Sequence, residues 1–325
     1  MEVCITNYGA RIVSIMIPDK NGKYSDIVCG FDNVHSYQQI RQNFGATVGR
    51  YISRILNAQM TIDSTTYHLQ QNGGKHISHG GYPGFADRIW SVKKSGRQTL
   101  QLMYVSPDGE NGFPGTLTTT LTFTLSKDNS LSLDYQATTD KPTVLNLSNH
   151  SFFNLSGNLN KSIENELLQM DGDSIAEYDS TKCVTGKFIT VASSPFDFKT
   201  MKRIGNRIDE DHAQLNVVHG YDHTWRLNSP GDIRKRAALL TDPESGRTME
   251  VYTTEPGLHI YTANGLNGKI IGKKQTAYPR RAAICFETMH FADSPNKPQF
   301  PSTLLRPGEQ FHSQTIFKFG TTETH

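Results

Sequence analysis

The sequence predicts an all-β fold, either a sandwich or a barrel, from two observations. Short segments alternate apolar and polar residues with a period of two, and Asp, Asn, Gly and Pro residues interrupt them at close intervals. No stretch of ten or more residues shows the spacing of apolar positions that an amphipathic helix requires. A chain of many short strands buries its apolar faces by packing antiparallel sheets on one another or by closing a barrel.

The first predicted strands lie close to the amino terminus. Val3 and Ile5 alternate with their neighbours before a turn at residues 8–9. A second strand spans residues 12–17 and ends at the Pro- and Gly-containing turn 18–22. The chain therefore enters sheet structure within its first few residues.

Two hairpins are predicted further along the chain. Residues 116–125 and 130–137 both alternate cleanly, and Asp128-Asn129 lies between them as a turn. The same pattern returns in three consecutive segments: the strand 236–241, the turn 242–246 and the strand 248–253.

A histidine stands at the end of a polar strand face in residues 143–157, which read TVLNLSNHSFFNLSG. Counting by two, Asn146, Ser148 and His150 share one face of a predicted strand. Leu145 and Leu147 share the other face. An imidazole titrates near pH 6.5, so His150 is a candidate proton donor or acceptor at neutral pH.

A glutamate with small neighbours stands in residues 283–287, which read AICFE. Glu287 shares its strand face with Ala283 and Cys285, whose small side chains leave space above the carboxylate for a ligand. Ile284 and Phe286 point the other way. A carboxyl group titrates near pH 4.3, so Glu287 is a candidate general base.

Composition excludes several classes of function. The 33 Lys and Arg residues nearly balance the 31 Asp and Glu residues, and no basic run or basic patch with interleaved aromatic residues predicts nucleic-acid binding. No apolar run reaches the ~18 residues of a membrane span. No clustered Cys/His spacing, Gly-rich phosphate loop or dinucleotide fingerprint is present, so we expect neither a metal nor a cofactor.

The four cysteines are Cys4, Cys29, Cys183 and Cys285, and their wide spacing fits a reduced, cytoplasmic protein. No signal peptide is visible at the start. The start is abrupt, and a removed leader would instead indicate a periplasmic or secreted protein, in which the cysteines could form disulfides.

The segment 143–157 closely resembles the segment around the catalytic acid in the aldose 1-epimerase (galactose mutarotase) family. Four more segments resemble family motifs in the family's order, and residues 305–309, LRPGE, resemble its closing turn. These four are FGATVGRYISRI (44–55), GGKHISHGG (73–81), GYDHTW (220–225) and AICFETMHFADS (283–294). Each motif alone is weak evidence for the family, whereas five motifs in the same order over nearly the whole chain are specific evidence for it.

The resemblance implies one catalytic domain over residues 1–325, a large antiparallel β-sandwich of the galactose mutarotase type. It implies interconversion of the α and β anomers of free hexoses such as glucose and galactose, with Glu287 as base and His150 as acid. It assigns sugar binding to Ser53, Arg54, His79, Asp222 and His259. The expected partner is a free sugar, without nucleic acid or membrane, and the expected assembly is a monomer or weak homodimer.

Three positions depart from the family pattern. Ser53 stands where many members have asparagine, His259 where a glutamine is common, and Phe152 where a tyrosine is frequent. His259 adds a titratable group beside the expected site, which bears on sugar preference. We also expect a carboxylate near His150 to raise its pKa.

Other functions remain open at the level of sequence. A glycoside hydrolase would pair Glu287 with Asp222 or Asp293, because that chemistry requires two carboxyl groups. A non-catalytic carbohydrate-binding β-sandwich would need sugar contacts but no matched acid and base. A relative acting on a phosphorylated hexose would need a basic pocket, which the sequence does not reveal.

Overall fold

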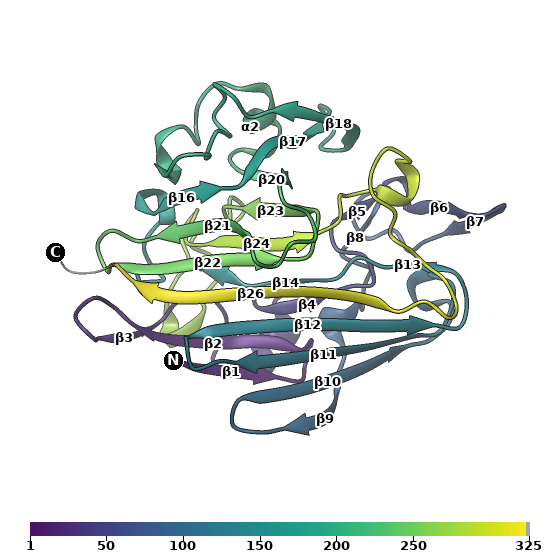
Figure 1. Ribbon diagram of the computed structural model, residues 1–325, viewed down its shortest axis with the longest axis horizontal. Coiled ribbons are helices and arrows are strands. Elements are labelled where there is room, and N and C mark those ends of the chain that lie inside the picture. Colours follow the sequence, from purple (N-terminus) through teal and green to yellow (C-terminus); the bar gives the residue numbers. More distant parts are fainter. Residues whose placement is uncertain (323–325) are drawn as a thin grey trace.

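Antiparallel strands dominate the computed structural model, which describes residues 1–322 (Figure 1). The larger sheet has nine strands. In spatial order they are β19 (Lys202–Arg203), β16 (Leu167–Met170), β21 (Arg236–Thr241), β22 (Arg247–Thr253), β26 (Phe311–Thr321), β12 (Ser130–Thr139), β11 (Leu117–Leu125), β10 (Thr99–Ser106) and β9 (Ser91–Ser95).

The second sheet has six strands and carries most of the residues discussed below. In spatial order they are β15 (Phe152–Phe153), β24 (Ile284–Met289), β23 (Gly257–Tyr261), β20 (Asp222–Leu227), β17 (Gly172–Tyr178) and β18 (Val184–Thr190).

Smaller sheets, two short α-helices and several 3-10 turns complete the described fold. A three-stranded sheet contains β1 (Glu2–Thr6), β2 (Arg11–Pro18) and β3 (Tyr24–Asp26). Four two-stranded sheets pair β13 (Thr143–Val144) with β25 (Leu304–Leu305), β14 (Ser148–His150) with β4 (Ala46–Val48), β5 (Arg54–Ile55) with β8 (Ile77–Ser78), and β6 (Gln59–Ile62) with β7 (Thr65–His68). The helices are α1 (Val34–Gln39) and α2 (Ala213–Val218).

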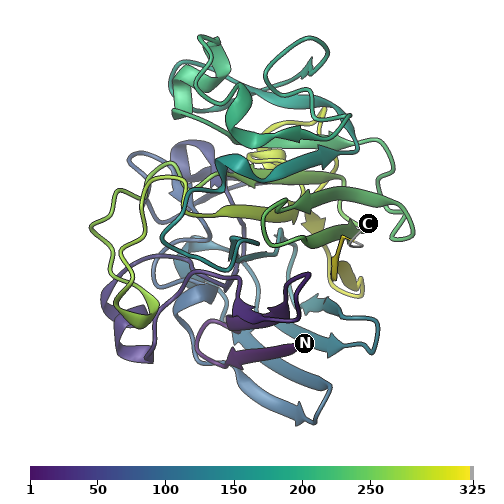
Figure 2. The same cartoon turned by 90° about the vertical axis from the view of Figure 1, so that its left-hand side faces the viewer.

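The two large sheets pack face to face around the main hydrophobic core. Phe286 and Ile284 of β24 are buried in that core with Phe317 of β26. Phe153 of β15 lies 5.1 Å from Phe317, measured between ring centroids. In both views the N-terminal strands, drawn in purple, lie at the opposite end of the molecule from β17 and β18 (Figures 1 and 2). The all-β prediction and the sandwich are confirmed.

The predicted hairpins and strands form as expected. β11 and β12 pair from Leu117↔Thr139 to Leu125↔Leu131, and the turn residue Asn129 adopts a positive φ of 59°. β21 and β22 form the later hairpin. On β24 the predicted alternation holds, because Cys285 belongs to a different hydrophobic cluster from Phe286.

The single strand predicted over residues 143–157 is wrong in one respect. The segment divides into β13, β14 and β15, which pair with β25, β4 and β24 respectively. Three different partner strands require changes of direction, which the alternation of side chains does not encode. The predicted faces survive locally, because Leu145 and Leu147 are buried in the main core.

Two further features bear on the environment of the protein. Across residues 1–322, no helix has the length and apolar character needed to cross a bilayer. Cys4 is exposed, and Cys29, Cys183 and Cys285 are buried; all four are free thiols.

Candidate active site

A pocket of about 270 Å³ lies over the face of the six-stranded sheet that points away from the main core. Its volume suits a small polar molecule. The residues that line it are Arg41, Gln42, Asn43, Ser53, Arg54, Ser78, His79, His150, Phe152, Tyr178, Asp222, His259, Tyr261 and Glu287. All seven residues for which the sequence predicted a catalytic or binding role are among them.

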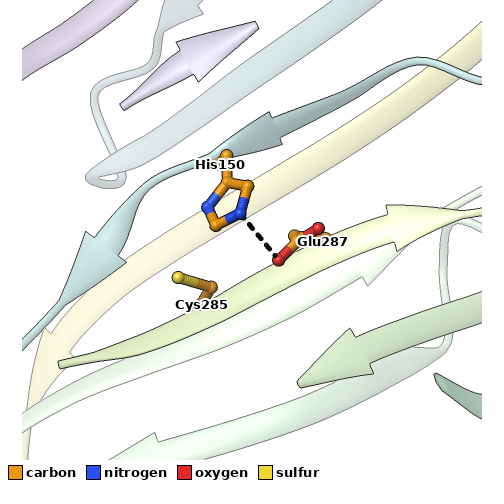
Figure 3. Close-up of side chains that lie close together, drawn as sticks. All are labelled: His150, Cys285 and Glu287. Atoms are coloured by element: carbon orange, nitrogen blue, oxygen red, sulfur yellow. Dashed lines mark ion pairs between the residues drawn. The ribbon is translucent and has the colours of Figure 1, made fainter. Parts of the chain in front are cut away.

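His150 and Glu287 come from different sheets and meet in this pocket. His150 is the last residue of β14, and Glu287 lies in the middle of β24. His150 Nε2 lies 3.4 Å from Glu287 Oε1 (Figure 3). The imidazole stacks on the ring of Phe152, with ring centroids 5.0 Å apart and an interplanar angle of 13°. This stacking fixes the plane in which the ring can approach the carboxylate.

Burial shifts the pKa values of this pair in opposite directions. Desolvation raises the pKa of Glu287 to about 7. Desolvation, together with the charges of His79 and His259, lowers the pKa of His150 well below its ordinary value. The expectation that the neighbouring carboxylate would raise the pKa of His150 is therefore wrong, because loss of solvent outweighs the attraction. The pair favours a neutral form that carries one proton.

Asp222 and His259 form a second pair on the neighbouring strands β20 and β23. His259 Nε2 donates to Asp222 Oδ1 at 2.9 Å, and His259 Nδ1 lies 2.9 Å from Thr224 Oγ1. Burial alone would lower the pKa of His259 and raise that of Asp222. Their hydrogen bond reverses both tendencies, so His259 has a raised pKa and Asp222 a lowered one. His259 also pairs in register with Glu287, which brings its charge beside that carboxyl group.

Arg54 and Arg50 have different environments and different roles in the structure. Arg54 lines the pocket, and its Nη1 donates to the backbone oxygen of Lys182 at 3.2 Å. Arg50 is buried elsewhere, and its guanidinium donates to Ser106 Oγ at 2.8 Å and to the backbone oxygens of Pro114 and Pro107, both at 2.9 Å. Arg50 therefore holds loops together.

Ser53 and His79 support each other's backbone at the edge of the pocket. The backbone N–H of His79 donates to the Ser53 carbonyl at 2.9 Å, and the Ser53 N–H donates to His79 Nδ1 at 3.4 Å. The neutral His79 ring therefore carries its proton on Nε2. Burial lowers the pKa of His79 to about 4, with a further contribution from Arg54. Both residues have positive φ, 65° for Ser53 and 52° for His79. Asparagine adopts a positive φ more readily than serine does. A serine rather than an asparagine at position 53 therefore lacks both this backbone preference and an amide side chain.

Gly80, next to His79, allows two loops to pack closely against each other. A Cβ on Gly80 would lie 2.1 Å from the carbonyl oxygen of Gly49, and Gly80 has a φ of 79°. Only glycine fits this contact between the two loops. It holds the His79 loop against the segment that carries Arg54.

Sequence reasoning missed several residues of the pocket. Tyr261 shares a strand face with His259, so period-two counting from His259 would have identified it. Tyr178 comes from β17 and carries no comparable signal. Arg41 lies at the rim with its guanidinium 3.5 Å from the centre of the Tyr82 ring, and the loop 41–43 gave no pattern at all.

One group of side chains in the described residues has the donor atoms of a metal site. The ligand atoms of His150, Cys285 and Glu287 all lie within 4.8 Å of one another (Figure 3). The thiol of Cys285 is fully buried beneath the pocket, and burial raises its pKa.

The comparisons with known proteins agree with this geometry. The family model described as aldose 1-epimerase matches residues 1–318. Mouse galactose mutarotase is 37% identical over 321 residues, covering 98% of this chain and 91% of the relative. The aldose 1-epimerase of Escherichia coli K12 is 34% identical over 321 residues, covering 98% and 92%.

Solved structures give the same result for the fold. An aldose epimerase homologue from C. elegans superposes with a TM-score of 0.91 at 28% identity, covering 99% of this chain and 96% of the other. Galactose 1-epimerase from Lactobacillus acidophilus gives a TM-score of 0.85 at 28% identity, covering 99% and 91%. With a family match over nearly its full length and relatives above 30% identity, the chain belongs to the aldose 1-epimerase family.

Proposed function

We propose that this protein interconverts the α and β anomers of free hexoses, glucose and galactose among them, with Glu287 as base and His150 as acid. The observation that carries the proposal is the 3.4 Å approach of His150 Nε2 to Glu287 Oε1 inside the pocket. Relatives named galactose mutarotase and aldose 1-epimerase support the reaction class.

The reaction requires one base and one acid on a single ring. Glu287 removes the proton of the C1 hydroxyl while His150 gives a proton to the ring oxygen, and the bond between C1 and the ring oxygen breaks. The open form is an aldehyde. Rotation about the C1–C2 bond presents its other face, and ring closure with the reverse proton transfers yields the second anomer. The overall reaction consumes no proton, metal or nucleotide.

The neutral form of the pair is consistent with this chemistry. Glu287 and His150 together hold one proton, and transfer of that proton across their 3.4 Å contact gives the reactive arrangement of carboxylate and imidazolium. Sugar hydroxyls entering the pocket supply hydrogen bonds that replace the missing solvent and favour the charged arrangement.

We propose that Ser53, Arg54, His79, Asp222 and His259 hold the sugar. Arg54 and the Nε2–H of His79 supply donors to hydroxyl oxygens. Asp222 has one carboxylate oxygen bonded to His259, which leaves the other free to accept from a sugar hydroxyl. His259 fixes the orientation of that carboxylate, because it is itself held by Thr224.

Two alternatives find less support. A glycoside hydrolase using Asp293 is disfavoured because Asp293 lies outside the pocket lining and its Oδ1 accepts from the Leu56 N–H at 2.9 Å. A hydrolase using Asp222 would require that carboxyl to act as an acid or nucleophile, whereas His259 lowers its pKa. A purely sugar-binding protein would have no reason to bury an acid–base pair.

We further propose that residues 1–325 act as one catalytic domain that needs no second subunit. The pocket is lined by residues from Arg41 to Glu287, and the main hydrophobic cluster contains residues from Ala10 to Phe319. The proposal includes a monomer or weak homodimer as the assembly. A reducing, cytoplasmic environment is consistent with the four free thiols.

Polarimetry tests the activity directly. Freshly dissolved α-glucose and α-galactose relax to the equilibrium rotation slowly in buffer, and we expect the protein to accelerate both. The matched control is a folded Glu287→Gln variant at the same concentration. Relaxation at the buffer rate for every aldose tested would refute the proposed function.

A further inference from the structure

Cys285 is a buried thiol beside the acid–base pair, and the proposed reaction does not use it. It lies two residues before Glu287 on β24, so both side chains project from the same face of the strand. Figure 3 shows the Glu287 carboxylate directed toward the ring of His150, with the Cys285 side chain beside them on the same strand. The three ligand atoms lie within 4.8 Å of one another, and the three residues are each no more than 6% exposed.

The three donors form a chemically selective set. Thiolate sulfur and imidazole nitrogen favour Zn²⁺ and similar borderline ions, whereas Mg²⁺ and Ca²⁺ prefer oxygen ligands. Three protein ligands with one open position are the usual arrangement of zinc sites that remain accessible to small molecules. His150 and Glu287 line the pocket, so an ion can reach them from it.

We propose that the imidazole of His150, the thiolate of Cys285 and the carboxylate of Glu287 form an inhibitory site for Zn²⁺ and related thiophilic divalent ions. Binding joins the ion to the thiolate, the neutral imidazole and the carboxylate. The thiol proton, and the proton shared by the acid–base pair, leave to solvent. A bound ion occupies the lone pairs of His150 and Glu287 that accept and donate protons in the reaction. It also takes up space in the pocket where the sugar would bind. Zn²⁺ therefore competes with the sugar. The inhibition rests on the proposed function, whereas the binding of the ion does not.

Other thiols in the chain provide matched controls. Cys183 Sγ lies 3.5 Å from His76 Nε2, which makes that pair the main rival for Zn²⁺. Cys29 is a second fully buried thiol in the same hydrophobic cluster as Cys285. The test therefore compares Cys285→Ala with Cys183→Ala and Cys29→Ala, all purified in chelator and then freed of it.

The first measurement is sugar mutarotation during titration with Zn²⁺, with Mg²⁺ as the control ion. We expect the wild-type protein, Cys183→Ala and Cys29→Ala to be inhibited at similar Zn²⁺ concentrations. Cys285→Ala should need at least about 10-fold more Zn²⁺, by analogy with the 10–100-fold losses caused by weaker perturbations of metal sites. Raised sugar concentration should relieve the inhibition. Equal sensitivity of Cys285→Ala and wild type, or equal inhibition by Mg²⁺, would overturn the proposal.

The second measurement needs neither activity nor the Cys285→Ala variant. Co²⁺ replaces Zn²⁺ in such sites, and a thiolate ligand gives a sulfur-to-cobalt charge-transfer absorption in the near ultraviolet. We expect this band in the wild-type complex with Co²⁺, and we expect it to persist in Cys183→Ala. A Co²⁺ complex without the band, or a band that disappears in Cys183→Ala, would overturn the site even if the protein proved not to be a mutarotase or Cys285→Ala failed to fold.

Discussion

His150 and Glu287 approach within 3.4 Å although 136 positions separate them in the chain, because β14 and β24 lie beside each other. Each side chain reaches this contact by a different route. His150 is held against Phe152 by ring stacking, and Glu287 by its place in the middle of β24. The contact is the centre of the proposed mechanism.

Replacing the base should abolish most activity without unfolding the protein. Glu287→Gln preserves size and hydrogen-bonding atoms but removes basicity, and we expect kcat to fall by about 10²–10⁴-fold. Circular dichroism and the melting temperature should stay close to wild type. A folded variant with the wild-type rate would show that Glu287 is not the base.

The pH dependence should reflect a pair that shares one proton. The depressed pKa of His150 sets the lower limit of the one-proton state, and the pKa of Glu287, about 7, sets the upper limit. In chelator-containing buffer, kcat/KM should therefore be level below about pH 7 and fall as pH rises further. Other charged or titratable groups in the pocket can shift the pH limits of the one-proton state. They are Arg54, His79, Asp222, His259 and Tyr261.

A variant without the acid should show the opposite slope. In His150→Asn the residual activity depends only on ionised Glu287, so it should be low and should rise as pH increases through the pKa of the carboxyl group. An unchanged alkaline limb in this variant would assign the acid to another group, and His79 would be the next candidate.

Weakening the sugar-binding pair should affect binding more than chemistry. Asp222→Asn removes the charge that His259 stabilises, and we expect a raised KM or a changed ratio of glucose to galactose activity, with a smaller change in kcat. His259→Gln restores the residue common in the family and should keep a hydrogen bond to Asp222. Steady-state kinetics on both sugars distinguish the variants. A sugar complex with no oxygen within about 3.2 Å of Arg54, His79 or Asp222 would contradict the binding proposal.

Two neighbouring arginines should respond differently to the same substitution. Arg50→Ala leaves several buried acceptors without a donor and should lower the free energy of unfolding by about 3 kcal/mol or more. Arg54→Ala should leave stability nearly unchanged and raise KM. Denaturant unfolding and kinetics on the two proteins test this. Equal loss of stability in both would place Arg54 in the scaffold.

Removal of metal ions should not reduce activity. The proposed reaction uses only side-chain proton transfer, so exhaustive chelation and dialysis should leave kcat/KM intact or raise it if a trace of Zn²⁺ was bound. Loss of activity on chelation, with recovery on addition of one metal, would contradict both the mechanism and the inhibitory site.

The sequence by itself determined the all-β class, the two hairpins and the faces of the strand that carries Glu287. These follow from local alternation and turn chemistry, which depend on residues close together in the chain. The ordered motifs also gave the family and all seven expected pocket residues.

Only the tertiary structure decided how those residues act on one another. The pairing of His259 with Asp222, the role of Arg50 as a scaffold residue and the place of Cys285 beneath the acid–base pair depend on contacts between distant strands. The pKa values required the structure as well. Motif spacing shows which charges lie in the site, whereas desolvation depends on everything packed around them, and for His150 desolvation outweighs the neighbouring carboxylate.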